Sequence, residues 1–245
     1  MRIDIVTLLP EIVGGLLAEG MVRRAVDAGV VEVNVIPMRA FGDGKHHTCD
    51  DAPFGGGSGM VLKADVVARA VESLPAAPGR RIAILSASGK PLDQATLEAF
   101  AGCPHLVLLC GRYEGMDERV RVALNAEEVS LGPFVLAGGE LPAMAIAEGI
   151  VRLLPGALGD PGSLAEESFT FGGGLLEYPH YTRPPEFRGH RVPQILLSGD
   201  HPKIARWRRW MALRKTREQR PDWFAKFSLG DDDRRLLESR EFEEE

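Results

Sequence analysis

The chain has 245 residues, of which 44% are hydrophobic and 26% are charged, a composition typical of an ordinary globular protein. No apolar run is long enough to span a bilayer, and no charged start precedes an apolar signal core, so we expect a cytoplasmic protein. The cysteines, Cys49, Cys103 and Cys110, lack the CxxC spacing that would indicate a disulfide framework or a zinc site.

The net charge of −6 is unevenly distributed along the chain. Residues 1–176 carry 14 basic and 22 acidic side chains, residues 177–228 carry 12 and 5, and residues 229–245 carry 3 and 8. A basic segment with a net charge of +7 therefore follows an acidic body. Such a segment is suited to binding phosphate groups, as in a nucleic acid.

The first predicted elements are a strand at 2–8, one helix from Pro10 to about Ala28, and a strand at 31–36. Gly29 is a typical helix stop. A strand–helix–strand order predicts a parallel sheet. We expect further strands at 81–85 and 106–109, a strand end at Val129, and helices at 63–73, 117–125 and 143–153.

A long irregular segment, residues 39–60, interrupts this pattern, and a loop of this length in a compact domain is typically functional or disordered. It contains His46, His47, Cys49 and Asp50, but the spacing fits known zinc patterns poorly, so we predict no metal site. The glycine-rich run at 55–60 is not a phosphate-binding P-loop, because no Gly-Lys-Ser/Thr follows it.

Three glycine-containing turns follow strand ends, at residues 86–91, 111–115 and 131–142. Each alone is an ordinary strand-to-helix connection. Ligands in open α/β sheets bind at such strand ends, so together these turns predict one pocket for a small polar ligand with an apolar body. No Gly-x-Gly-x-x-Gly opens the first helix, which argues against an ordinary dinucleotide-binding fold.

Turn-forming residues at 155–162 predict a domain boundary, and 163–174 has the composition of a linker. A helix is then expected at 204–220, with Trp207 and Trp210 on one face and Arg206 and Arg209 on another. That pattern is typical of an amphipathic helix with a solvated basic face. The charge of the region favours a face that contacts phosphates.

Two motifs, residues 110–119 (CGRYEGMDER) and 130–144 (SLGPFVLAGGELPAM), resemble those of the bacterial tRNA (guanine-N1)-methyltransferases, TrmD, of the knotted SPOUT class. The segments 177–184 and 196–201 match as well, so the resemblance covers nearly the whole chain. It implies an α/β fold: a mostly parallel sheet flanked by helices, with a C-terminal trefoil knot and a small helical C-terminal domain. It also implies three parts: residues 1–160 binding S-adenosylmethionine, a flexible linker at 161–176, and a helical tRNA-binding domain at 177–245.

The activity that the resemblance implies is S-adenosylmethionine-dependent methylation of N1 of the guanosine 3′-adjacent to the anticodon. The family acts as a homodimer, and its reaction is supported by Mg²⁺, to which we assign no residue. Two other functions stay open: a non-catalytic RNA-binding or S-adenosylmethionine-sensing protein, and a knotted ribose 2′-O-methyltransferase. The linker and the helical appendage follow the guanine-N1 pattern, and the acidic and basic groups around the linker argue against a sensor.

The resemblance also assigns binding residues. The cofactor site would comprise Leu85, Ser86, Ala87, Gly111, Tyr113, Glu114, Leu131, Gly132, Pro133, Phe134, Val135, Leu136, Gly138, Gly139 and Pro142. The tRNA would contact Asp50, His180, Arg183, Ser198, Asp200, Arg206, Arg209 and Arg214, with Arg188 and Arg217 contributing to the basic region.

For catalysis, Arg152 aligns with the family's arginine, and Glu167 occupies the position of its base, which is usually an aspartate before Ser-Phe. Guanine N1 carries a proton at neutral pH, so a carboxylate must accept it while an arginine stabilises charge on the O6 side. Glu166 is the rival base and Asp160 a more distant one; alternatively, all three are solvated linker acids. We favour Glu167, because its register with Ser168-Phe169 matches the family.

Overall fold

The structure is a computed structural model that describes residues 1–158, 166–239 and 241–242. Contacts divide the chain into two compact units, Met1–Gly159 and Asp160–Glu245. No helix in the described part of the chain is long and apolar enough to cross a membrane. The predicted boundaries of domains and linker stay predictions.

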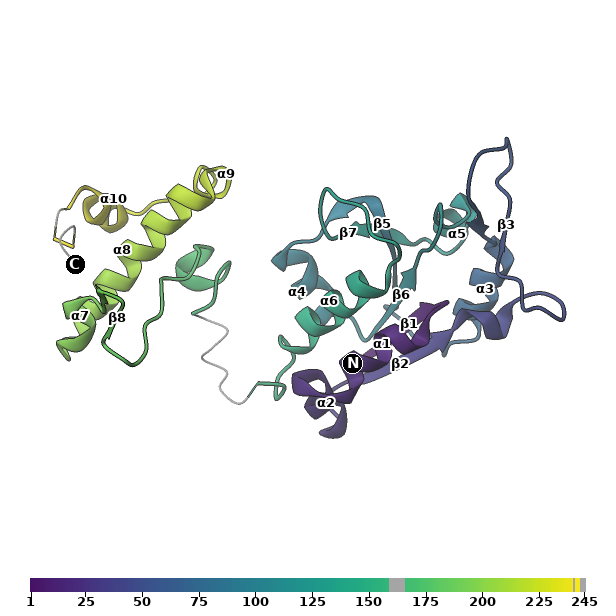
Figure 1. The fold of residues 1–245 in the computed structure, drawn as a ribbon, viewed down its shortest axis with the longest axis horizontal. Coiled ribbons are helices and arrows are strands. Elements are labelled where there is room, and N and C mark those ends of the chain that lie inside the picture. Colours follow the sequence, from purple (N-terminus) through teal and green to yellow (C-terminus); the bar gives the residue numbers. More distant parts are fainter. Residues whose placement is uncertain (159–165, 240, 243–245) are drawn as a thin grey trace. The chain divides into compact units, whose positions relative to one another are not determined.

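The first unit is a five-stranded, fully parallel sheet in the order β2-β1-β6-β5-β7 (Figure 1). Its strands are β1 (Arg2–Thr7), β2 (Glu32–Pro37), β5 (Arg81–Pro91), β6 (His105–Cys110) and β7 (Glu127–Ser130). Its helices are α1 (Pro10–Ala18), α2 (Gly20–Asp27), the 3₁₀ helix Met38–Phe41, α3 (Ala64–Glu72), α4 (Gln94–Ala101), α5 (Glu118–Ala123) and α6 (Glu140–Val151). The predicted α/β class is confirmed, and the trefoil knot stays a prediction.

Both faces of this sheet are buried. Successive side chains of a strand alternate between faces, so Leu106 and Leu108 of β6 join one core cluster while Val107 and Leu109 join the other. Helices α1, α2, α4 and α6 cover the first face, and α3 and α5 cover the second. Coverage on both faces is typical of a parallel sheet and leaves the strand ends for ligand binding.

Two local predictions are wrong. The single helix expected from Pro10 to Ala28 is interrupted, because Glu19 is extended and Gly20 has a φ of 80°, so α1 and α2 are separate helices. The strand expected to end at Leu85 continues to Pro91 through an irregularity at 86–89, and it pairs with β7 on both sides of that irregularity.

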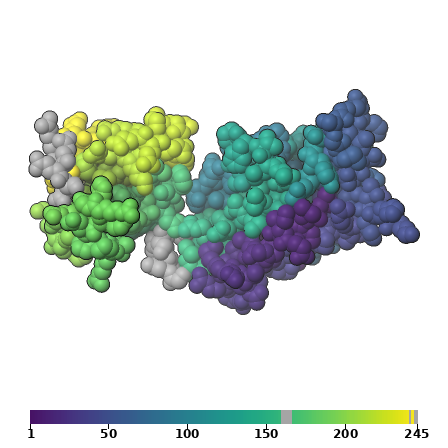
Figure 2. Space-filling view, in the orientation of Figure 1, coloured from purple at the N-terminus to yellow at the C-terminus, as the bar shows by residue number. Residues whose placement is uncertain are grey.

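The long segment between β2 and α3 contains a short antiparallel pair, β3 (Asp50–Asp51) and β4 (Val61–Leu62). It is coloured blue in Figure 2, where it projects from the edge of the first unit. Phe54, at its tip, is 98% exposed. Cys49 is buried in the core, and burial raises the pKa of its thiol.

In the residues that the structure describes, the regular structure of the second unit is helical, apart from the hairpin of β8 (Glu186–Phe187) and β9 (His190–Arg191). Its helices are the 3₁₀ helix Phe171–Gly173, α7 (Gln194–Leu197), α8 (His201–Gln219), α9 (Pro221–Phe224) and α10 (Asp231–Glu238). Trp207, Trp210 and Leu213 of α8 pack into a core with Leu175, Leu236 and Phe242. The helix expected at 204–220 is present and begins three residues earlier.

Candidate active site

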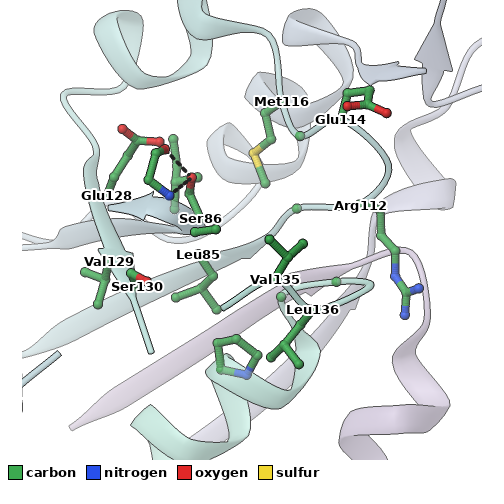
Figure 3. A pocket seen from close by; sticks show the side chains of 18 of the residues that line it. Leu85, Ser86, Arg112, Glu114, Met116, Glu128, Val129, Ser130, Val135 and Leu136 are labelled. Atoms are coloured by element: carbon green, nitrogen blue, oxygen red, sulfur yellow. Dashed lines mark hydrogen bonds between the residues drawn. The ribbon is translucent and has the colours of Figure 1, made fainter. Parts of the chain in front are cut away.

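The irregular stretch of β5 and the loops that follow β6 and β7 enclose a cavity of about 450 Å³ beside the carboxyl ends of β6 and β7. Of the predicted cofactor residues, all except Gly132 and Pro133 line this cavity. Leu85, Val135 and Leu136 form its apolar side in Figure 3. The structure therefore brings the two motifs into one site, although they are separate in the sequence.

The loops after β6 and before α6 lie directly against each other. The backbone N–H of Gly139 donates to the Gly111 carbonyl at 2.9 Å, and Arg112 and Gly138 form an isolated antiparallel bridge. A Cβ atom on Gly139 would lie 2.7 Å from the Cα of Cys110, whereas one on Gly111 would meet nothing nearer than 3.4 Å. The backbones of the two loops therefore approach closely here, and Gly139 is the position at which this approach requires a glycine.

The third wall comes from the irregularity in β5. Residues 86–89 protrude between the two stretches that pair with β7, and the hydroxyl oxygens of Ser86 and Ser88 lie 2.7 Å apart. A Cβ atom on Gly89 would lie 2.5 Å from the backbone nitrogen of Val129, so only glycine fits there. This wall depends on the pairing of β5 with β7 and has no local sequence signal beyond the Gly-Lys-Pro turn.

Sequence reasoning missed several residues of the cavity. The lining also includes Ile84, Ser88, Arg112, Gly115, Met116, Asp117, Glu118, Arg121, Glu128, Val129, Ser130 and Ala137. Seven of these twelve residues lie inside the two motifs, so taking each motif as a whole would have found them: Arg112, Gly115, Met116, Asp117, Glu118, Ser130 and Ala137. Glu128 lies outside the motifs, and only its position beside the strand end predicted at Val129 could have indicated it.

Cys110 lies at the end of β6, beside this cavity, but is fully buried. Burial raises the pKa of its thiol well above the ordinary value, and the negative charge of Glu140 adds to this effect. The thiol therefore stays protonated at neutral pH, which makes Cys110 a core residue and not a nucleophile.

The predicted catalytic residues lie in different units. Arg152 is the half-buried C-cap residue of α6, and Glu167 is half-buried in the second unit. Near Glu167, the Ser168 hydroxyl accepts from the Glu177 backbone N–H at 3.0 Å, and the Phe169 ring contacts Trp223. These contacts fix the register of the acidic segment within the second unit.

The rival base, Glu166, already has a partner. The hydroxyl of Tyr178 donates to its carboxylate at 2.9 Å. Burial and this hydrogen bond raise the pKa of Tyr178, so the phenol stays protonated and able to donate. Asp160, the third candidate, lies outside the described residues.

The predicted tRNA-contacting residues have varied surroundings. Asp50 belongs to β3 of the first unit, and the others belong to the second unit. The His180 ring lies 2.6 Å from a carboxylate oxygen of Glu177, and the Ser198 hydroxyl donates to the Ile195 carbonyl. Asp200 is the N-cap of α8, where its side chain accepts from Lys203. Arg183 is exposed.

The arginines of α8 are partly occupied within the unit. Arg209 forms a bidentate ion pair with Asp233, with Nε to Oδ1 at 2.8 Å and Nη2 to Oδ2 at 2.7 Å. Its Nη1 also donates to the Gly172 carbonyl. Arg206 pairs with Glu241 at 2.7 Å, and Arg214 lies over the Trp210 ring. Among the residues the structure describes, no group of three His, Cys, Asp or Glu side chains is arranged to hold a metal ion.

The fold and the cavity define an α/β protein with a ligand-sized site at the strand ends and a separate helical unit that contains the basic segment 177–228. Residues 1–226 match the family described as tRNA (Guanine-1)-methyltransferase TrmD. The chain therefore belongs to that family.

Individual relatives with the name of this family are similar to the chain over nearly its whole length. The chain is 49% identical over 240 residues to the tRNA (guanine-N(1)-)-methyltransferase of Anaeromyxobacter dehalogenans, covering 98% of this chain and 97% of the relative. It is 48% identical over 241 residues to that of Moorella thermoacetica, covering 97% and 96%. It is also 48% identical over 246 residues to that of Geobacillus kaustophilus, covering both chains completely.

Proposed function

We propose that the protein transfers a methyl group from S-adenosylmethionine to N1 of the guanosine immediately 3′ of the anticodon in tRNA. The observation that carries this proposal is the single cavity formed by the two motifs, in a chain that belongs to a tRNA methyltransferase family. Since tRNA is the substrate, we place the enzyme in the cytoplasm.

The cavity suits S-adenosylmethionine in size and chemistry. Ligand sites typically have volumes of about 300–1,000 Å³, apolar walls and a few convergent polar groups. Leu85, Val135 and Leu136 supply apolar walls for the adenine and methionine parts, and the loops around Gly111 and Gly138 offer backbone donors and acceptors. When bound, S-adenosylmethionine supplies an electrophilic methyl group on a sulfonium.

We assign the proton transfer to Glu167 and the charge stabilisation to Arg152. The Glu167 carboxylate would accept the proton of guanine N1, and the Arg152 guanidinium would stabilise the negative charge developing on O6. Glu167 is the acid that directly precedes Ser168-Phe169, the register in which the resemblance places the family's base. Glutamate is one methylene longer than the aspartate usual in the family, so its backbone would sit further from the base.

The second unit would hold the anticodon stem through its phosphates, which position the RNA without reading its sequence. The target guanine would leave the base stack to reach the cavity. We also propose that Mg²⁺ supports the reaction, with no residue assigned to it; addition of a chelator should then slow methyl transfer, and full activity in excess chelator would refute this point.

The proposal is tested by incubating the protein with labelled S-adenosylmethionine and tRNA, digesting the RNA and identifying the labelled nucleoside. Label in N1-methylguanosine is the expected result, and a transcript with adenosine 3′ of the anticodon should stay unlabelled. Label on a ribose would instead indicate a 2′-O-methyltransferase. No label in any tRNA would favour a binding or sensing protein.

We further propose a homodimer in which one chain contributes Arg152 and the other contributes Glu167 to each site. Homodimers of Arg152→Ala or Glu167→Gln should be nearly inactive. When both variants are co-expressed, half of the dimers are mixed and carry one intact site, so about a quarter of the sites should regain activity. If each site used a single chain, mixing would restore nothing, and a fully active monomer in sedimentation would refute the dimer itself.

A further inference from the structure

A buried carboxylate joins three separate segments beside the cavity. Glu140, the first residue of α6, is 1% exposed. The hydroxyl of Thr7, the last residue of β1, donates to its Oε1 at 2.7 Å, and Nη2 of Arg112 lies 3.1 Å from its Oε2. The same Thr7 hydroxyl accepts from the backbone N–H of Leu9. One side chain thus links the ends of β1 and β6 to the start of α6.

This buried ion pair is expected to add little to the free energy of unfolding. A buried ion pair loses hydration energy that its mutual attraction only partly returns, and apolar packing often serves as well. The position of Glu140 in the first turn of a helix lowers this penalty, because the helix dipole favours negative charge there. Since the pair adds little stability, we look for its role in the relative positions of the segments that it joins.

The segments it holds are the loops that line the cavity. A Cβ atom on Gly138 would lie 2.4 Å from Oε2 of Glu140 and 2.5 Å from Nε of Arg112, so a side chain there would displace the pair. Arg112 lines the cavity through its loop, while its side chain in Figure 3 points away from Leu85, Val135 and Leu136. Glu140 is not among the described residues that line the cavity, so it acts on a ligand only through the loops.

We propose that Glu140 is a positioning residue. Together with Thr7 and Arg112 it forms a clamp that holds loops 111–115 and 131–139 at the separation that S-adenosylmethionine requires. A site whose loops are fixed before binding loses less conformational freedom when the ligand arrives. This inference deepens the proposed function and rests on it for the identity of the ligand.

The first test compares Glu140→Gln with Asp4→Asn. Asp4 is also a buried carboxylate of the first unit, and it accepts from Arg2, Asn34 and His105. It lies on β1 three residues before Thr7 and does not line the cavity. Both variants remove one buried charge, so each should lower the melting temperature, and Asp4→Asn reports the effect of instability alone.

Titration calorimetry should show different affinities of Glu140→Gln and Asp4→Asn for S-adenosylmethionine. We expect Glu140→Gln to raise the dissociation constant about 10- to 100-fold, the range typical for the loss of a supporting contact around a bound group. Asp4→Asn should stay within about twofold of the wild type, because distant sites rarely couple. Equal dissociation constants for the two variants would overturn the clamp.

A second pair of variants tests the same contact if Glu140→Gln does not fold. Thr7→Val keeps the shape of the side chain but removes the hydroxyl, and Thr7→Ser keeps the hydroxyl. Affinity should fall in Thr7→Val and be retained in Thr7→Ser. Full affinity in Thr7→Val would contradict the proposal, since a branched side chain alone would then suffice.

Hydrogen exchange provides a readout that does not depend on the ligand. Loops 111–115 and 131–139 should exchange faster in Glu140→Gln or Thr7→Val than in Asp4→Asn. If the wild type binds no S-adenosylmethionine, the proposed function fails, and this exchange measurement still decides whether Glu140 holds the loops. Unchanged exchange in both loops would refute the clamp whatever the ligand.

Discussion

The contact between Gly139 and the end of β6 leads to a quantitative prediction for Gly139→Ala. The added Cβ atom would lie 2.7 Å from the Cα of Cys110 and 3.0 Å from the nitrogen of Gly111, and both neighbours are backbone atoms. To reach ordinary contact at 3.4 Å, the two loops must separate by about 0.7 Å. The 2.9 Å hydrogen bond from Gly139 to Gly111 would then lengthen to a distance at which it is largely lost.

The expected result is weaker binding of S-adenosylmethionine. Overpacking typically costs about 1–3 kcal/mol. If this cost mainly destabilises the conformation that binds the ligand, the dissociation constant should rise about 5- to 150-fold. Backbone strain does not explain such a loss, because Gly139 has a φ of −84°, which alanine adopts readily. Titration calorimetry and a thermal melt on the same preparation measure affinity and stability together.

Gly102→Ala is the matched control. Gly102 follows α4, has a φ of −77°, and a Cβ atom there would meet nothing nearer than 3.7 Å. It should bind S-adenosylmethionine like the wild type. If Gly139→Ala also binds like the wild type, the contact between the two loops does not set the shape of the cavity, and the assignment of the site fails with it.

Further variants test the remaining assignments. Glu167→Gln should slow single-turnover methyl transfer by about 10²–10⁴-fold at unchanged cofactor affinity, while Glu166→Gln should keep most of the rate; the reverse pattern would shift the base by one residue. Arg217→Ala should reduce the slope of log affinity for tRNA against log salt by about one, whereas Arg209→Ala should mainly lower the melting temperature, because it leaves Asp233 unpaired. The hydrogen bond from Arg209 lowers the pKa of Asp233 in the folded protein. The ion pair therefore stabilises the fold fully above the pKa of an unfolded aspartate, about 3.9. This stabilisation is lost as the pH falls through the folded pKa of Asp233. Asp233→Asn should therefore lower the melting temperature at pH 7, and by progressively less as the pH falls below about 3.9, as followed by circular dichroism.

The cavity could be predicted because its signals are local. Glycine-containing turns after apolar strands mark ligand sites in parallel sheets, and the two motifs supply the residues of two walls. The sequence predicts the turn at residues 86–91 as the third wall, but it does not indicate that β5 resumes within that turn. The irregularity exists because Lys90 and Pro91 pair with β7 after residues 86–89 have left the sheet, and such pairing depends on the tertiary structure.

The clamp illustrates what a sequence cannot reveal without a fold. Thr7 and Glu140 are 133 residues apart, yet they share a hydrogen bond in the core. In the sequence, Glu140 is an acidic residue just before the helix predicted at 143–153, and such a residue would ordinarily be exposed. Its burial follows from the position of α6 against β1 and β6, and that position is set by the packing of the whole first unit.

The basic face of α8 shows a related limit, because counting charges predicts a surface but not its contacts. Arg206 and Arg209 pair with Glu241 and Asp233, which belong to the acidic segment at the end of the chain. In the described part of the chain, no carboxylate lies within 4.0 Å of Arg183 or Arg217. Phosphates of a bound RNA would therefore meet these two arginines directly, whereas they would compete with the acidic segment for Arg206 and Arg209. If α8 binds RNA as proposed, Glu241 and Asp233 would weaken its attraction for RNA in general, and a correctly shaped tRNA would have to supply additional contacts to displace them.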